Sequence, residues 1–297
     1  CFEAMRGRFL AGFLLSLSLF CFGSKALAAT PLPMFTAYVP QSDEFVSAVV
    51  MIPKTQQVLY SFKPDLPHPA ASLTKLPGAL AFLSRNIPMS RSVRLVAADE
   101  VGGGRLRVSV GAKMTVQDLF FSSISASANN TAMALGRLSG LPKAVFLQKM
   151  NREAQLAGAT HSIFVDFSGM DSRNMTTAHD MALIADRAFA NPALRRAATT
   201  GQYSFTVYEG TKKIAKTIKN TNALLTSDPE MWVLGGKTGY LEESKNNLAV
   251  RLRQLDEHGT PMPGTDVLVV VFGSETKQDM FASAKRLAQW AWNNHVF

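Results

Sequence analysis

A serine and a lysine lie three positions apart in an otherwise apolar stretch, PAASLTKLPGAL. In a helix, the side chains of Ser72 and Lys75 would share one face, with Cβ atoms roughly 5–6 Å apart. A serine hydroxyl becomes a strong nucleophile when a neighbouring base removes its proton. Lys75 can remove it only as a neutral amine, which an apolar pocket favours by lowering the lysine pKa. The pair therefore suits acyl transfer, although on its own it is more typical of a helix N-cap followed by a solvated charge.

Two later groups of polar residues strengthen the catalytic interpretation. Ser127 and Asn129 interrupt a stretch with helical spacing, and Lys237-Thr238-Gly239 enters a predicted strand after two glycines. Alone, the first group is typical of a surface and the second of a turn. In this order and on these elements, they complete the S-x-x-K, S-x-N and K-T-G pattern of a group of serine acyl-transfer enzymes.

The hydrophobic pattern predicts strands at both ends of the chain and helices between them. Two β-branched runs, at 46–52 and 57–62, are typical of a hairpin. Helical spacing follows at 115–138, 142–158 and 176–191. After Pro229 come three strand-like segments and a closing amphipathic helix: MWVLGGKTGYL, NNLAVRLRQL, TDVLVVVFG and 276–294. We expect an α/β (α+β) fold in which both termini form one sheet and a helical lobe is inserted between them.

The phrases around the three motifs resemble the low-molecular-mass penicillin-binding proteins, the serine D-alanyl-D-alanine peptidases that trim bacterial peptidoglycan. The resemblance runs from about residue 37 to 293 and includes PAASLTK, SASANNTAMALGR, FVDFSGMDSRNMTTAHDMALIA, KNTNALL and GGKTGY. It implies a five-stranded antiparallel sheet, a helical lobe and an active site in the cleft between them. It also implies a serine D-Ala-D-Ala carboxypeptidase that uses no cofactor, acts on peptidoglycan peptides and is inhibited covalently by β-lactam antibiotics.

The resemblance assigns catalytic roles to Ser72, Lys75 and Ser127, and a supporting role to Lys237. Ser72 would be the nucleophile and Lys75 the base that activates it. Ser127 would pass a proton to the leaving amine. Lys237 would be the second cation that lowers the pKa of Lys75.

Substrate-binding roles fall on the second and third motifs. Asn129 would hold the amide carbonyl of the substrate, and Lys237 and Thr238 would face its carboxylate. Gly239 would let the substrate backbone lie close along the strand. The backbone N–H group of Tyr240 would join that of the nucleophilic serine in stabilising the oxyanion.

A class A β-lactamase is one alternative, because those enzymes have the same three motifs. They add a glutamate between the second and third motifs, which activates the water for deacylation. Between Asn130 and Lys237 this chain has only Glu153, Glu209 and Glu230, and none lies in GMDSRNMT, where such a glutamate would be expected. We therefore favour a peptidase. A wall-binding or drug-sensing protein with a dead site is the non-enzymatic alternative, and the intact motifs argue against it.

Departures from the carboxypeptidase pattern support a second alternative, a DD-endopeptidase that cuts peptide cross-links. The family's carboxypeptidases usually have a threonine two places after K-T-G, where this chain has Leu241. Many have an arginine that holds the terminal carboxylate of the substrate, where this chain has Glu275 in GSET. A negative charge at that position would repel a carboxylate.

The N-terminal segment has the features of a secretory signal. Two arginines after Met5 precede about fifteen mostly apolar residues and then Ala26-Leu27-Ala28. The apolar run is shorter than the ~20 residues that span a bilayer. We predict that 1–28 are signal, with 1–4 as upstream sequence, and that 29–297 form a single catalytic domain without a stable membrane anchor or the family's C-terminal β-rich domain. We expect export to the periplasm or the extracellular face of a bacterial envelope.

Composition excludes several other classes of site. Cys1 and Cys21 both precede the predicted cleavage point, so the mature chain would have no disulfide or thiol nucleophile. The five histidines lack metal-ligand spacing. The formal net charge is +9, but the basic residues are scattered and accompany no nucleic-acid motif. The segment GGGRLRVSVG, with Arg105 and Arg107, is predicted to be a loop and a strand that flank the cleft, and no role is assigned to these arginines.

Overall fold

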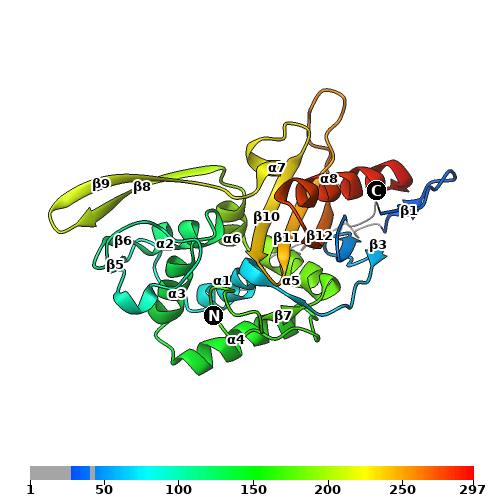
Figure 1. Ribbon diagram of the computed structural model, residues 1–297. Helices are drawn as coiled ribbons and strands as arrows, with labels where there is room; N and C mark the ends of the chain where they lie inside the picture. Colours follow the sequence, from blue (N-terminus) through cyan, green and yellow to red (C-terminus); the bar gives the residue numbers. More distant parts are fainter. Residues whose placement is uncertain (1–27, 41–43) are drawn as a thin grey trace, which may run out of the picture.

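The computed structural model describes residues 28–40 and 44–297. The predicted signal segment, up to residue 27, lies outside the described residues. The rest forms a sheet flanked by helices and a helical lobe beside it (Figure 1). Among the described helices, none is both long and apolar enough to cross a bilayer.

The central sheet has five antiparallel strands in the order β10-β11-β12-β2-β3. The strands come from both ends of the chain, as predicted: β2 Ser47–Met51, β3 Val58–Phe62, β10 Trp232–Leu241, β11 Lys245–Arg253 and β12 Val267–Ser274. Every residue of β12 is buried, because helix α5 (Ala178–Ala190) and helix α8 (Lys277–Asn294) both pack against it. This double covering explains the continuous apolar run VLVVVFG.

The helical lobe contains the first two motifs. Its helices are α1 Lys75–Leu83, α2 Val116–Ile124, α3 Asn129–Leu138, α4 Lys143–Leu156 and α6 Pro192–Ala198, with α5 between the lobe and the sheet. A short 3₁₀ helix, η1 (Ala71–Thr74), leads directly into α1. Pro77 lies in the first turn of α1, where a proline is tolerated because its missing N–H would have no partner there. The polar interruption predicted within 115–138 is the break between α2 and α3.

A second sheet of four strands was not identified from the sequence. It contains β5 Ser92–Arg94, β6 Lys113–Thr115, β8 Gln202–Glu209 and β9 Lys212–Lys219. The β8–β9 hairpin extends away from the lobe as a long arm, at the left of Figure 1. The prediction of a strand within GGGRLRVSVG is wrong, since 101–110 form a loop. Short elements complete the described chain: β1 Thr30–Pro31, β4 His68–Pro69, η2 Ala97–Asp99, β7 Met175–Thr176, α7 Ala223–Thr226 and β13 His295–Val296.

Candidate active site

The three motifs meet at one pocket of about 450 Å³ between β10 and the lobe. Six of the predicted site residues line it: Ser72, Ser127, Asn129, Thr238, Gly239 and Tyr240. The other two, Lys75 and Lys237, lie beneath it, each only 1% exposed. The structure therefore brings together residues that are separated by more than half of the chain.

The amine of Lys75 contacts the proposed nucleophile directly. Its Nζ lies 2.7 Å from Ser72 Oγ and 2.8 Å from Asn129 Oδ1, and it also donates to the backbone carbonyl of Ser168. A neutral amine has two N–H donors and one lone pair. The two carbonyl oxygens can take the donors, which leaves the lone pair for the hydroxyl hydrogen of Ser72.

Burial sets the protonation of Lys75. It lowers the pKa of Lys75 to about 7, while the carboxylate of Asp166 acts in the opposite direction. The sequence analysis attributed the lowering in part to Lys237. In the structure, loss of hydration is the main cause of the lowered pKa of Lys75. Repulsion between the two amines contributes to lowering the pKa of Lys237. Near neutral pH a substantial fraction of Lys75 is thus available as a base.

Lys237 lies on β10 and reaches the second motif. Its Nζ donates to Ser127 Oγ at 2.6 Å and to the Thr238 carbonyl at 2.8 Å. Burial, together with the charge of Lys75, lowers the pKa of Lys237 well below its usual value. Two buried amines without a carboxylate in direct contact cannot both hold a proton easily, so the pair is sensitive to any anion that enters the pocket.

The backbone around the nucleophile is strained and tightly packed. Ala71 and Ser127 have φ angles of +49° and +59°, which is uncommon for residues other than glycine and is concentrated at functional sites. Gly169 also has a positive φ, of +84°, and a Cβ there would overlap the carbonyl oxygen of Ala71. This loop therefore needs glycine in order to approach the segment that carries Ser72.

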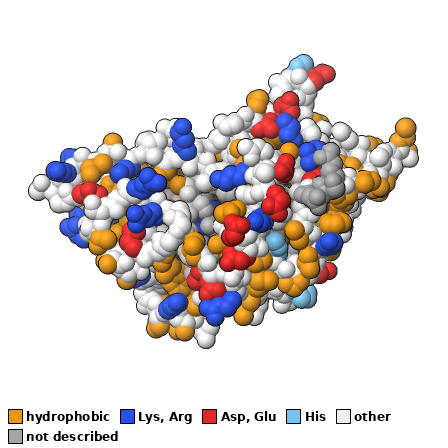
Figure 2. Space-filling model, viewed as in Figure 1, with side chains coloured by type: hydrophobic (Ala, Val, Ile, Leu, Met, Phe, Trp, Pro, Cys, Tyr) orange, Lys and Arg blue, Asp and Glu red, His pale blue; other side chains and the backbone are white. Residues whose placement is uncertain are grey.

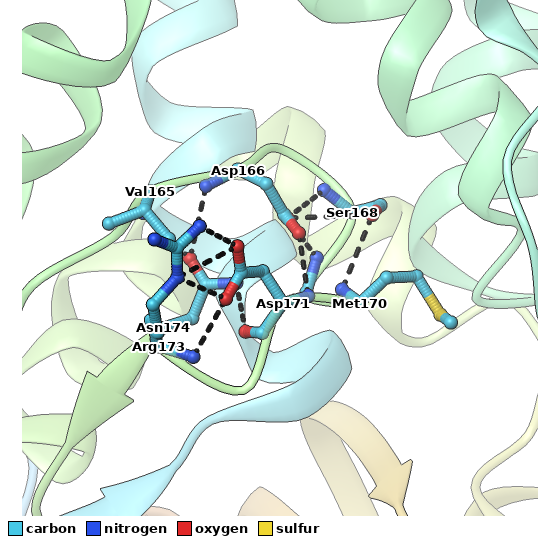
Figure 3. A network of polar contacts seen from close by, with 8 residues as sticks. Val165, Asp166, Ser168, Met170, Asp171, Arg173 and Asn174 are labelled. Atoms are coloured by element: carbon cyan, nitrogen blue, oxygen red, sulfur yellow. Dashed lines mark hydrogen bonds and ion pairs between the residues drawn. The ribbon is translucent and has the colours of Figure 1, made fainter.

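The loop at 165–174, which holds the Ser168 carbonyl against Lys75, is organised by one carboxylate (Figure 3). Asp166 accepts hydrogen bonds from the backbone N–H groups of Ser168, Gly169 and Asp171 at 2.7, 2.5 and 2.8 Å. Asn174 supports the same loop by accepting from the N–H group of Asp166 at 3.2 Å. The sequence analysis quoted this stretch but gave Asp166 no role. Asp166 stands two residues before Ser168-Gly169, and this combination of turn-favouring residues could have indicated it.

The second motif holds a neighbouring loop in addition to lining the pocket. The backbone N–H group of Asn129 donates to the Gly104 carbonyl, and its side-chain amide donates to the Gly102 carbonyl, both at 2.8 Å. Asn130, which received no role from the sequence, accepts from the Leu106 N–H group at 2.9 Å. The loop before Arg107 is therefore fixed relative to Ser127.

The structure gives a reason for glycine at position 239 that the sequence did not reveal. Strand β10 packs against η1, and a Cβ at Gly239 would lie 2.9 Å from Leu73 Cδ1 and 3.2 Å from the Ala70 carbonyl oxygen. Glycine is thus required for the close approach of the third motif to the first. Beside it, Thr238 Oγ1 lies 2.6 Å from Thr221 Oγ1 at one end of the pocket.

The three glutamates between the second and third motifs lie elsewhere. Glu153 pairs with Arg187 at 2.7 Å, Glu209 accepts from the Ser109 N–H group at 2.7 Å, and Glu230 pairs with Lys285 at 2.6 Å. None of the three lines the pocket with Ser72. These three glutamates are therefore not placed to activate a deacylating water at Ser72.

Comparison with known proteins agrees with this geometry. The model of the D-alanyl-D-alanine carboxypeptidase family matches residues 36–274, which include all three motifs. A D-alanyl-D-alanine endopeptidase of Pseudomonas aeruginosa is 29% identical over 98% of this chain and 91% of that protein. A D-alanyl-D-alanine carboxypeptidase of Bacillus subtilis is 27% identical over 85% of this chain and 63% of that protein. The crystal structure of the Streptomyces K15 DD-transpeptidase is similar with a TM-score of 0.76 at 25% identity, covering 86% of this chain and 100% of that one.

Proposed function

The chain belongs to the D-alanyl-D-alanine carboxypeptidase family and is a serine D-Ala-D-Ala peptidase, and we propose that it works through an acyl-enzyme on Ser72. The observation that carries this proposal is the contact of 2.7 Å between Ser72 Oγ and the Nζ of Lys75, whose pKa burial lowers to about 7. A lysine in this state can act as a general base at neutral pH.

In the acylation step, neutral Lys75 takes the proton of the Ser72 hydroxyl as Oγ attacks the carbonyl carbon of the scissile amide. The backbone N–H groups of Ser72 and Tyr240 stabilise the oxyanion, and each such donor typically contributes about 10²–10³ in rate. Ser127 then donates a proton to the leaving amine as the C–N bond breaks. Its Oγ contacts Lys237, which can restore that proton.

Lys237 would respond to the carboxylate that flanks the scissile bond. In the free enzyme, burial and the nearby amine disfavour its charged form. A substrate carboxylate beside Lys237 and Thr238 would compensate for both effects and favour the ammonium form. Substrate binding would therefore place a positive charge at Lys237 and leave Lys75 neutral, which is the distribution that acylation requires.

Hydrolysis of the acyl-enzyme by water completes the cycle. A β-lactam would acylate the same serine, and its adduct would decay slowly because none of the glutamates between the second and third motifs lines the pocket to act as a dedicated base. The proposed substrates are peptidoglycan peptides, and β-lactam antibiotics are the proposed covalent inhibitors.

The carboxypeptidase reaction, removal of a terminal D-alanine, is the first predicted reaction. Cleavage of peptide cross-links is the second candidate, because Glu275 stands in the sequence where many carboxypeptidases of the family have the arginine that holds the terminal carboxylate. Glu242 accepts from the hydroxyl of Tyr240 at 2.7 Å, and the charges of Glu242 and Glu275 both act on that tyrosine. The two negative charges near Tyr240 favour a substrate that does not end in a free carboxylate.

The two reactions are separated by their products. The purified protein would be incubated with intact muropeptides, and the products would be weighed by mass spectrometry. Loss of one alanine from pentapeptides identifies a carboxypeptidase, whereas conversion of cross-linked dimers to monomers identifies an endopeptidase. No conversion of either substrate would contradict the assigned reaction class.

We also propose the cellular setting and domain organisation. The family acts on the bacterial cell wall, so action in the envelope follows from membership. Export through the signal at 1–28, and a single catalytic domain at 29–297, are our proposals for how the chain reaches and acts on that substrate.

A further inference from the structure

A large groove opens from the active-site pocket toward the β8–β9 arm. Its volume is about 860 Å³, and it shares Gly103, Gly104 and Ala126 with the active-site pocket. The loop at 100–110 forms one wall and strand β9 forms the other. A ligand bound at Ser72 could therefore continue into this groove without leaving the protein surface.

The groove has a small net excess of positive charge. Arg105, Arg107 and Lys216 line it together with Glu100 and Glu209. Glu100 pairs with Arg105 at 3.3 Å, and Glu209 accepts from the Ser109 N–H group at 2.7 Å while its charge also acts on Lys216. Within the part of the chain that the structure describes, Arg107 and Lys216 form no ion pair. Figure 2 shows that Lys and Arg side chains gather on this side of the molecule, where the arm lies in Figure 1.

Hydrogen bonds hold the two walls together and fix them to the second motif. Lys216 Nζ donates to the Arg107 carbonyl at 3.0 Å, and the Ser109–Glu209 contact joins the loop to the arm again. Alternation along β9 places Ile214, Lys216 and Ile218 on one face, toward the loop. An extended chain would thus find apolar and cationic side chains at regular spacing in a pre-formed site.

The groove begins at the leaving-group end of the active site. Ala126, which lines both spaces, directly precedes Ser127, the residue proposed to protonate the leaving amine. In a carboxypeptidase reaction the leaving group is a single alanine, which is too short to fill the groove. In a cross-link the leaving group is a whole second stem peptide, an extended chain that carries free carboxylates.

We propose that this groove binds the leaving stem peptide of a peptidoglycan cross-link through its carboxylates, which contact Arg107 and Lys216. The inference rests on the proposed acyl-enzyme at Ser72 and gives the enzyme a means of selecting cross-linked dimers over linear peptides.

The test compares the double variant Arg107→Gln/Lys216→Gln with Lys219→Gln, which removes a lysine from the opposite face of the same strand. For each protein, kcat and KM would be measured with a cross-linked muropeptide dimer and with a monomeric pentapeptide, and the rate of acylation by penicillin would be recorded separately. We expect kcat/KM for the dimer to fall about tenfold in the double variant, mainly through KM. The pentapeptide and penicillin reactions should change by less than about twofold, and Lys219→Gln should behave as wild type.

Several results would overturn the proposal. They are an unchanged dimer reaction in the double variant, an equal loss with the pentapeptide, an equal loss in Lys219→Gln, or a wild-type enzyme that labels with penicillin yet leaves dimers intact. In each of these cases acylation of Ser72 can still be observed, so the assignment of the nucleophile stands. Failure of the wild-type protein to form any Ser72 adduct would instead overturn the proposed function.

Discussion

The catalytic centre and the arm-side groove use cations in opposite ways. Lys75 and Lys237 are each 1% exposed and have short, specific partners, whereas the Arg105 side chain in the groove is 58% exposed. Burial changes the chemistry of the two lysines, because loss of hydration lowers their pKa values. The groove cations are exposed or half-buried, which suits the attraction of an anionic chain. The same residue types thus serve as a base in one region and as a binding surface in the other.

The largest expected effect concerns the buried centre. Ser72→Ala should abolish covalent labelling by a fluorescent penicillin, because the atom that would form the ester is removed while the fold is retained. Labelling would be followed on a gel, with circular dichroism as the control for folding. A labelled and folded Ser72→Ala protein would place the nucleophile elsewhere. It would contradict the catalytic role that we assign to the buried centre.

The two buried lysines should respond differently to the same substitution. Arginine keeps a positive charge but does not deprotonate, so Lys75→Arg should lower the acylation rate by about 10²–10⁴, as is typical for loss of a general base. Lys237→Arg should retain measurable acylation, because Lys237 is proposed to act as a cation. Stopped-flow acylation with one β-lactam would measure both.

A Lys75→Arg enzyme that acylates nearly as fast as wild type would contradict the neutral-lysine mechanism. In that case the lysine of PAASLTK would be required for structure, through its bonds to Asn129 and the Ser168 carbonyl. Thermal unfolding of both variants would distinguish a folding defect from a catalytic one.

Asp166 should influence the pH profile of acylation, because its charge raises the pKa of Lys75 and its hydrogen bonds hold the loop that contacts Lys75. In wild type the rate should rise with pH through about 7 and then level off, because neutral Lys75 is the reactive form. The carboxylate of Asp166 raises the pKa of Lys75, so Asp166→Asn should move this rise to lower pH. The plateau rate should also fall several-fold, since the amide offers one oxygen, in place of two, to three backbone N–H groups.

Asp171→Asn is the matched control, because Asp171 lies in the same loop but pairs with the exposed Arg173 at 2.6 Å. Its pH profile should match that of wild type. A profile that shifts equally in both variants, or in neither, would show that Asp166 does not position or polarise the Lys75 site.

Much of the fold was predictable because burial leaves a strong pattern in the sequence. The β-branched runs of β2 and β12 are buried in the central sheet, so their apolar pattern is continuous. The three motifs could be recognised because each combines fixed residue types at a short, fixed spacing. The β8–β9 arm was missed because most of its residues are exposed or half-buried, which weakens the alternation of apolar and polar residues. Asp166 was missed because it bonds to the backbone of its own loop, and the sequence marks such bonds only by the turn-favouring residues Ser168 and Gly169 nearby.

The smallest expected effect separates the two regions by ionic strength. Screening shortens the range of charge interactions from about 10 Å at 0.1 M salt to about 3 Å at 1 M, and it acts mainly on exposed groups. Added salt should therefore raise KM for a cross-linked dimer about two- to threefold through the groove, whereas the Lys75–Ser72 contact is buried and should be insensitive. The measurement is KM for the dimer across a salt series, with a pentapeptide as reference and Arg107→Gln/Lys216→Gln as the variant. Two results would contradict this prediction: salt changes the dimer and pentapeptide reactions alike, or salt still weakens dimer binding in the double variant. Either result would show that the groove cations do not select cross-linked dimers, and that the charge contrast between the two regions has no role in substrate choice.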